Sequence, residues 1–501
     1  MNFSIIDWII VIAYLLLMLL IGYLSSRNNK TAEDYILGGK TMNPFMIGIS
    51  LFATLFSTLS YLSYPGEMIK YGPVFLAGIL ALPLANWIVG KFLIPKFMQM
   101  NVKSAYEILE IQLGTNTRKL AVFFFLCLRF LWMTTIIYAT VDIAMVPILN
   151  IDRSLVPYIS IALSILTVIY TTMGGIKAVV RTDVAQSFIM FFGLIMTIVF
   201  VISQLSPDQS LLNPSVYAHW GSFDWGIHPT KRMTVGNIII LILVIQVCTA
   251  GSDQMAIQRY LSTKSSKDAS SSYNISLWGG GLIKILLAIA GICVMAFFFY
   301  NPEIIENGGT IYDHADSLFP LYIRVGLPPG LTGLITAALL AAAMSSLSSG
   351  LNSSSTVILE DILKKRKKKG RQAPSDDKSD LKLIKKISFI LGILVALSTF
   401  FLPYITGNLF DIIQKVVNLV VAPLFVLFFM ALFVPYATDR SSVLAGVFSL
   451  AIAILIAFFE LFGISSLWVT TFSLVGGITL GVLLSFIDNL LIIKRNNGGK
   501  V

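Results

Sequence analysis

Cysteine and histidine are scarce in this sequence of 501 residues, which contains only three of each. All three cysteines fall in apolar runs without metal-ligand spacing or a disulfide framework, which argues against redox chemistry. All three histidines lie between such runs, where they cannot relay protons through a membrane. A long polar stretch is also missing, because the largest gaps between apolar runs are 205–232, 301–329 and 362–383. None of them has room for a kinase or nucleotide-binding module.

Charged residues are few as well, at 12% of the chain against 56% hydrophobic residues, and the mean hydropathy is +0.82. This composition excludes a soluble globular domain. Apolar runs recur that are long enough to cross a hydrocarbon core about 30 Å thick, so we predict an all-α polytopic membrane protein with about 13 spanning helices. The predicted spans are 5–25, 43–69, 75–98, 118–148, 156–174, 182–204, 233–251, 273–300, 330–361, 384–404, 409–435, 441–462 and 466–491.

Lysine and arginine gather in alternate loops, including the run at 364–369 within the polar loop 362–383. This asymmetry predicts a multi-pass protein of the plasma or inner membrane, with its N-terminus outside and its C-terminus in the cytoplasm. It also accounts for the formal net charge of +10 through topology and contact with anionic lipid, without any nucleic acid. The first apolar run is expected to be a retained helix, because it is too long for a signal peptide and lacks a basic leader.

A row of hydroxyls interrupts the apolar run at 330–361. Ser345, Ser348 and Ser349 are spaced i, i+3 and i+4, so one helix face presents three oxygens. Lipid cannot solvate hydroxyls, which must therefore face protein, water or an ion. Small hard cations take such oxygen ligands. The alternative is helix–helix packing, in which serines and small residues are ordinary.

Two apolar runs carry breaks, one among the hydroxyls of residues 53–61 and one at 249–254, and Pro65-Gly66 is expected to end the first of these segments. Interrupted segments at corresponding positions of two halves indicate an inverted-repeat transporter. The predicted organisation is an N-terminal helix and inner loop at 1–42, inverted five-helix repeats at 43–204 and 233–435, an outer loop at 205–232, and two C-terminal helices with a tail at 436–501.

Ionisable residues inside the apolar runs are a further signal, because burying charge in a bilayer is costly. Asp183 begins the sixth run at the depth of the serine row, where a carboxylate and hydroxyls could hold a monovalent cation and stay neutral. The alternatives are an ion pair with Arg181 or Lys177, or a helix cap. Lys284 has no acid nearby in the sequence, so it needs a distant partner, a cavity or a substrate.

Other polar side chains in the runs have simpler interpretations. Arg129 lies near the inner third of its span, where it can snorkel to the surface. Lys415 can pair with Asp411 one turn earlier. Gln414 and Asn418 share another face of that helix and can hydrogen-bond a solute.

Three segments resemble the sodium:solute symporter family, and the resemblance extends over essentially the full length. They are Gly-Gly-Ile-Lys-Ala-Val-Val-Arg-Thr-Asp-Val-Ala-Gln at 174–186, Ser-Asp-Gln at 252–254 with Gln-Arg-Tyr at 258–260, and the serine-rich residues 342–352. The resemblance implies a LeuT-like fold of two inverted five-helix repeats and alternating access driven by an inward Na⁺ gradient.

The same resemblance implies two sodium sites. The first corresponds by position to the backbone carbonyls of Ala53, Phe56 and Ala342 and the hydroxyls of Ser345 and Ser346. The second, held by an aspartate and neighbouring serines in bacterial sialic acid symporters of the family, corresponds to Asp183, Ser345, Ser348 and Ser349. Two Na⁺ per solute are therefore expected.

The solute pocket resembles several branches of the family. Lys284 and Gln414 fall where galactose-type symporters contact sugar. Ile79 replaces a polar residue, and Trp132 stands where sialic acid symporters bind a carboxylate with arginine, although Arg129 lies one turn away. Residues 57–58 and 65–67 resemble the monocarboxylate and multivitamin branch. Sugar or polyol, sialic acid and small carboxylate all remain open. The expected pocket residues are Ser57, Thr58, Ser60, Arg129, Trp132, Lys284 and Gln414.

The sequence therefore predicts a secondary active transporter that imports a small polar organic solute with Na⁺ and can work as a monomer. An intramembrane enzyme would need a nucleophile–base pair or a metal cluster at one depth, and neither His nor Cys supplies it. A sodium channel, which would conduct without solute, and a transporter-like sensor are the remaining alternatives.

Overall fold

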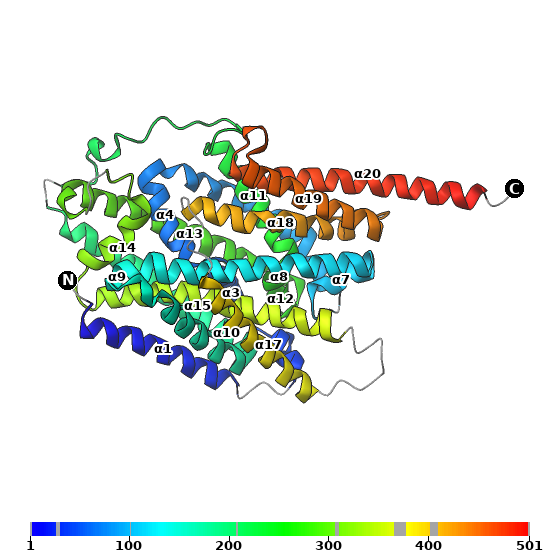
Figure 1. Cartoon of the computed structure of the whole chain (residues 1–501), viewed down its shortest axis with the longest axis horizontal. Coiled ribbons are helices and arrows are strands. Elements are labelled where there is room, and N and C mark those ends of the chain that lie inside the picture. The colour runs from blue at the N-terminus through cyan, green and yellow to red at the C-terminus, as the bar shows by residue number, and fades with distance from the viewer. Residues whose placement is uncertain are drawn as a thin grey trace.

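The computed structural model describes residues 3–26, 31–100, 102–206, 209–305, 310–364, 377–400 and 409–498. The regular secondary structure of this part of the chain is entirely helical, with no strand (Figure 1). Its α-helices are α1 Ile5–Ser26, α2 Ala32–Leu37, α3 Pro44–Leu55, α4 Thr58–Tyr71, α5 Leu82–Ile88, α6 Ile94–Met98, α7 Ala105–Gln112, α8 Thr115–Tyr138, α9 Val146–Leu149, α10 Val156–Gln204, α11 Val235–Ser252, α12 Gln254–Leu261, α13 Ser266–Tyr300, α14 Ala315–Val325, α15 Leu331–Val357, α17 Asp377–Ser398, α18 Leu409–Phe433, α19 Asp439–Phe459 and α20 Val469–Gly498.

Nine helical segments among the described residues are long and apolar enough to cross a membrane, and a tenth span is the bent pair α3–α4. Helix α10 contains two of the predicted spans, since its backbone leaves helical geometry at Gly175 (φ 56°, ψ −148°). The predicted spans at 384–404 and 409–435 correspond to α17 and α18. The expected number of about 13 spanning helices is compatible with this arrangement.

The second predicted span is broken in the structure. Helix α3 ends at Leu55, extended backbone follows at Phe56 and Ser57, and α4 starts at Thr58 with its axis bent by 66°. The prediction that Pro65 and Gly66 end this segment is wrong, because α4 continues through both to Tyr71. Proline removes one helical hydrogen bond, whereas Gly66 allows α14 to pack closely, since a Cβ there would lie 2.4 Å from a side-chain oxygen of Asp316.

The seventh predicted span is also interrupted where expected. Helix α11 ends at Ser252, and α12 starts at Gln254. Asp253 between them has extended backbone, and its carboxylate accepts a hydrogen bond from the backbone N–H of Met255 at 2.9 Å. This N-cap fixes the point at which the new helix begins.

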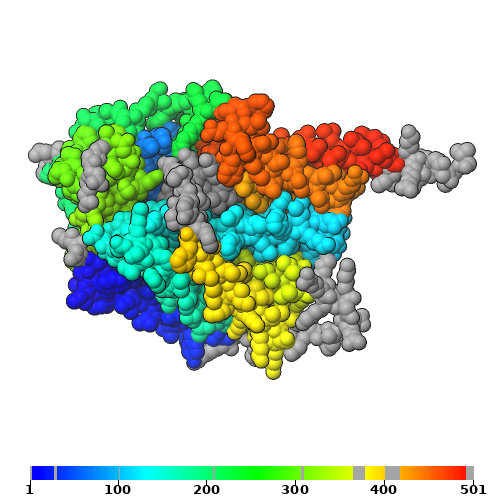
Figure 2. Space-filling model, viewed as in Figure 1, coloured from blue at the N-terminus to red at the C-terminus, as the bar shows by residue number. Residues whose placement is uncertain are grey.

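Helix α15 lies in the interior, where every residue from 335 to 357 is buried. It packs against α1, α3, α8, α10, α12 and α17, while α18, α19 and α20 pack together at the side of the molecule (Figure 1). Helix α20, drawn in red, extends beyond its neighbours α18 and α19 (Figure 2). The serine row is therefore surrounded by protein on all sides.

The N-terminal end of α15 is fixed by the first helix. The Asp7 carboxylate of α1 accepts hydrogen bonds from the backbone N–H groups of Gly330 and Gly333, each at 2.7 Å. Gly333 is required for this contact, because a Cβ there would lie 2.5 Å from the Cα of Asp7. Asp7 thus satisfies two of the four N–H groups that a helix start leaves without partners.

Candidate functional site

The broken end of α3 meets the serine row of α15. The Ser345 hydroxyl donates to the carbonyl of Ala53 at 2.9 Å and to that of Ala342 at 3.1 Å, and the Ser346 hydroxyl donates to the carbonyl of Thr54 at 3.0 Å. The last carbonyls of a helix lack partners within it, so these hydroxyls satisfy the end of α3. Hydroxyl and carbonyl oxygens of this kind are the ligands that hard cations prefer.

The residues expected at the first sodium site are therefore largely brought together. Ala53, Ala342 and Ser345 share one set of hydrogen bonds, and Ser346 contacts the next carbonyl along α3. Phe56 is the C-cap of α3 and stands at the break itself. All five are buried.

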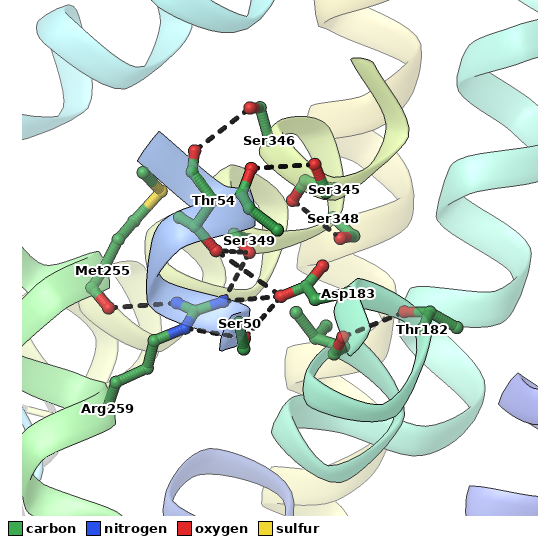
Figure 3. A network of polar contacts seen from close by, with 12 residues as sticks. Ser50, Thr54, Thr182, Asp183, Met255, Arg259, Ser345, Ser346, Ser348 and Ser349 are labelled. Carbon is green, nitrogen blue, oxygen red and sulfur yellow. Dashed lines mark hydrogen bonds and ion pairs between the residues drawn. The ribbon is translucent and has the colours of Figure 1, made fainter. Parts of the chain in front are cut away.

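The residues expected at the second site surround an ion pair. Asp183 of α10 is fully buried, and its Oδ2 atom accepts from the Ser50 hydroxyl at 2.5 Å and from Arg259 Nη2 at 3.0 Å (Figure 3). The partners considered from sequence are not used, because Lys177 pairs with Asp34 and Arg181 hydrogen-bonds Ser25. Nor does Asp183 cap a helix, since α10 continues through it.

Arg259 of α12 joins the members of this cluster (Figure 3). Its Nε atom donates to the Ser50 hydroxyl at 2.9 Å, Nη1 to the Met255 carbonyl at 3.0 Å, and Nη2 to the Ser349 hydroxyl at 2.6 Å. Ser349 is thereby connected to Asp183 through the guanidinium. Sequence reasoning included Arg259 in a family motif and assigned it no role.

The other side of the carboxylate faces the remaining serines. Asp183 Oδ1 has no hydrogen-bond partner among the described residues, and in Figure 3 it points to the side on which Ser348 lies. The Ser348 hydroxyl donates to the Ser345 carbonyl at 3.0 Å. A buried carboxylate such as Asp183, which has one oxygen without a hydrogen-bond donor and lies near Ser345 and Ser348, is suited to binding a cation.

A cavity of about 180 Å³ opens beside the break, which is room for several waters, since one needs roughly 10–15 Å³. Its wall contains four of the expected pocket residues: Ser60, Arg129, Trp132 and Lys284. Ser57 and Thr58 do not line it, and the Thr58 hydroxyl donates to the Leu339 carbonyl at 2.8 Å. The side chain of Gln414 lies outside the described residues.

Sequence reasoning missed several polar residues of this wall. They are Tyr64, Gln246, Thr249 and Ser276. Gln246 and Thr249 are one turn apart on α11, so two polar residues on one face of an otherwise apolar run were the available signal.

Of the two cationic residues in the cavity wall, Arg129 has an ion-pair partner and Lys284 has none among the described residues. Arg129 does not snorkel but pairs with Asp253, its Nη2 atom lying 2.5 Å from Oδ2, and both residues are buried. Lys284 makes no ion pair or hydrogen bond with the described residues, and its Nζ lies 5.7 Å from the centre of the Tyr64 ring. The cation–π contact compensates an ammonium only weakly. Among the described residues, the wall therefore carries one positive charge that an anion could neutralise.

Broken helices that meet a hydroxyl-bearing helix beside a polar cavity define a membrane transporter for an ion and a solute. The chain belongs to the sodium:solute symporter family, whose model matches residues 35–448. Sodium/sialic acid symporter SiaT of Proteus mirabilis (strain HI4320) is 30% identical over 472 residues, covering 91% of this chain and 90% of that protein.

Two further comparisons agree. Sodium-coupled monocarboxylate transporter 1 of Xenopus laevis is 26% identical over 343 residues, covering 67% of this chain and 54% of that protein. The solved substrate-bound, outward-open state of a Na⁺-coupled sialic acid symporter matches with a TM-score of 0.83 at 25% identity, over 97% of this chain and 98% of that one. The expected LeuT-like fold class is confirmed, and the protein is a Na⁺-coupled solute symporter.

Proposed function

We propose that this symporter imports a small organic carboxylate, with sialic acid as the leading solute, together with two Na⁺. The observation that carries the proposal is the uncompensated Lys284 ammonium in the cavity wall. A partly buried charge without an ion-pair partner is unfavourable, so a solute that brings a carboxylate is favoured there. A neutral sugar or polyol would leave that charge unpaired.

The surroundings of Lys284 suit a carboxylate attached to a polar body. Ser60, Gln246, Thr249 and Ser276 offer hydrogen bonds, and Trp132 offers a flat apolar face. The named relatives that transport sialic acid and monocarboxylates both handle carboxylates. In this chain Lys284 takes the part of the carboxylate-binding arginine, because Arg129 is already neutralised by Asp253.

The first sodium binds where α3 meets α15. The ion takes the carbonyl oxygens of Ala53 and Ala342 and the hydroxyl oxygens of Ser345 and Ser346, with Phe56 contributing its carbonyl at the break. These ligands come from two helices far apart in sequence, so the ion ties the broken helix to α15. Sodium binding thereby favours the state in which solute enters from outside, as alternating access requires.

The second sodium binds at Asp183 with Ser345 and Ser348. This second ion determines whether the membrane potential contributes to uptake, because a carboxylate carried with one Na⁺ moves no net charge across the membrane. With two Na⁺ one net positive charge enters, which at about 150 mV contributes about 3.5 kcal/mol, or roughly 300-fold accumulation. The second ion therefore lets the membrane potential drive import of an anion. The proposed orientation has the N-terminus outside and basic loops inside.

Uptake into proteoliposomes tests the solute. The purified protein is reconstituted with an inward Na⁺ gradient, and uptake of labelled sialic acid, lactate, galactose and a polyol is compared with uptake in potassium or choline. A carboxylate should enter only with Na⁺, and unlabelled carboxylates should compete where neutral sugars do not. Na⁺-driven galactose or polyol uptake that carboxylates leave unchanged would overturn the proposed solute class.

A further inference from the structure

The two oxygens of the Asp183 carboxylate have unequal surroundings. Oδ2 accepts hydrogen bonds from Ser50 at 2.5 Å, from Arg259 at 3.0 Å and, at a long 3.5 Å, from Thr54. Oδ1 has no partner among the described residues, although Asp183 is fully buried. Arg259 therefore holds one oxygen and leaves the other available.

A second buried acceptor without a partner among the described residues lies one helical turn from Asp183. Gln186 follows Asp183 by three residues on α10, which puts both side chains on one helix face. It is fully buried, its Nε2 atom donates to the Tyr14 hydroxyl at 3.1 Å, and its Oε1 atom has no partner within the described residues. Buried acceptors without donors are unfavourable. Two of them on one face of α10, which packs against α15, indicate a position for a cation.

Arg259 is rigidly held. All three of its guanidinium nitrogens donate, to Ser50, to the Met255 carbonyl, and to Asp183 and Ser349. The side chain is 1% exposed. A guanidinium fixed by four acceptors does not swing out to make room for an ion, so its charge is permanent in the site.

A neighbouring pair adds no charge of its own. Arg129 is neutralised by Asp253, and its Nη1 atom contacts the sulfur of Met255 at 3.5 Å while Arg259 contacts the carbonyl of the same residue. Two arginines and two aspartates thus form a neutral cluster. A sodium ion bound at Asp183 would make this cluster positive.

We propose that Arg259 is the fixed counter-ion that weakens the second sodium site, in which Asp183 Oδ1 and Gln186 Oε1 act with Ser345 and Ser348. This inference rests on the proposed two-sodium function and assigns Arg259 and Gln186 to it. A bare carboxylate in a dry interior would bind Na⁺ too tightly to release it to the cytoplasm. Because Arg259 shares the carboxylate, the ion can bind from outside and still leave, as transport requires.

The experiment measures sodium binding in Arg259→Gln and Arg259→Lys. Purified protein is titrated with NaCl against KCl at constant ionic strength, and the rise in melting temperature gives the half-saturating Na⁺ concentration. Removing a buried positive charge beside the site should lower that concentration about tenfold or more in Arg259→Gln. Arg259→Lys keeps the charge and should stay within about twofold of the wild type.

Two controls separate charge from structure. Arg118→Gln also breaks a buried arginine–aspartate pair, with Asp361, and should lower the melting temperature equally in both salts. In an Asp183→Asn background, Arg259→Gln should no longer tighten sodium binding, because the charge that it unmasks is absent. Gln186→Leu should weaken sodium binding in the wild type.

The behaviour of Arg259→Gln in the two salts supports or overturns the inference. Arg259→Gln that binds Na⁺ no more tightly than the wild type, or that fails to fold in sodium as well as in potassium, overturns the inference. If Arg259→Gln folds only in sodium, the inference is supported, since the ion then replaces the lost charge. A wild-type protein that shows no Na⁺-dependent melting shift would contradict the proposed sodium sites themselves.

Discussion

The hydroxyl of Ser345 lies 2.9 Å from the carbonyl oxygen of Ala53, although 292 residues separate the two in the sequence. This contact joins the end of the broken α3 to the middle of α15. Both residues are fully buried, so no water competes for their oxygens. A sodium ion bound by both oxygens would strengthen the connection between α3 and α15.

Ser345→Ala removes a hydroxyl shared by both proposed sodium sites. We expect Na⁺-driven uptake to be abolished while the melting temperature in potassium falls by a few degrees at most, because one hydrogen bond contributes about 1 kcal/mol. Ser353→Ala on the same helix is the matched control, since among the described residues its hydroxyl donates only to the Gly350 carbonyl within α15. Uptake that keeps its sodium dependence in Ser345→Ala would remove the first site.

Asp183→Asn tests the second ion. The Hill coefficient for sodium should fall from near two towards one, because the carboxylate that compensates the second charge is lost. Folding will also suffer, since an unpaired buried charge at Arg259 costs about 3–5 kcal/mol. The double variant Asp183→Asn/Arg259→Gln avoids that penalty and should also give a coefficient near one. A value that stays near two in both variants would exclude Asp183 as a ligand.

The break in α3–α4 could be predicted because hydroxyls interrupt an apolar run, and a hydroxyl in lipid needs a partner. The end of the segment could not. Pro65-Gly66 resembles a helix stop, yet α4 continues to Tyr71 and packs closely against α14 at Gly66. Local propensity was overridden by a tertiary contact that no spacing reveals.

The ion pair of Asp183 could be predicted only in part. Its burial and its depth near the serine row follow from the pattern of apolar residues. Its partner, Arg259, lies 76 residues away on a helix that follows a break, and sequence spacing does not give the depth of such a helix. The nearer candidates, Arg181 and Lys177, use other partners.

Lys284→Gln tests the solute charge. Neutralising the ammonium should raise the KM for a carboxylate about tenfold or more, since charged hydrogen bonds contribute about 1.5–3 kcal/mol. Lys284→Arg should retain part of the affinity, because the charge remains. The sodium-dependent melting shift measured without solute should be unchanged in both. Equal KM values for all three proteins would show that Lys284 does not contact the solute.

Asp7→Ala tests whether the first helix fixes α15. The loss of two hydrogen bonds to the backbone N–H groups of Gly330 and Gly333 should cost about 1–2 kcal/mol, as the loss of a helix N-cap does. Asp7→Asn retains one oxygen that can accept from Gly330 and Gly333, but it loses the favourable charge at the helix start and the Oδ2 acceptor of Ser4. Its melting temperature should therefore lie between those of Asp7→Ala and the wild type. Because Asp7 lies at the N-terminal end of α15 and the serine row lies in the middle of that helix, both variants should bind sodium with the wild-type half-saturation once folded. A melting temperature unchanged in Asp7→Ala would show that α15 holds its position without α1, and a shifted sodium affinity would show that the cap also sets the geometry of the serine row.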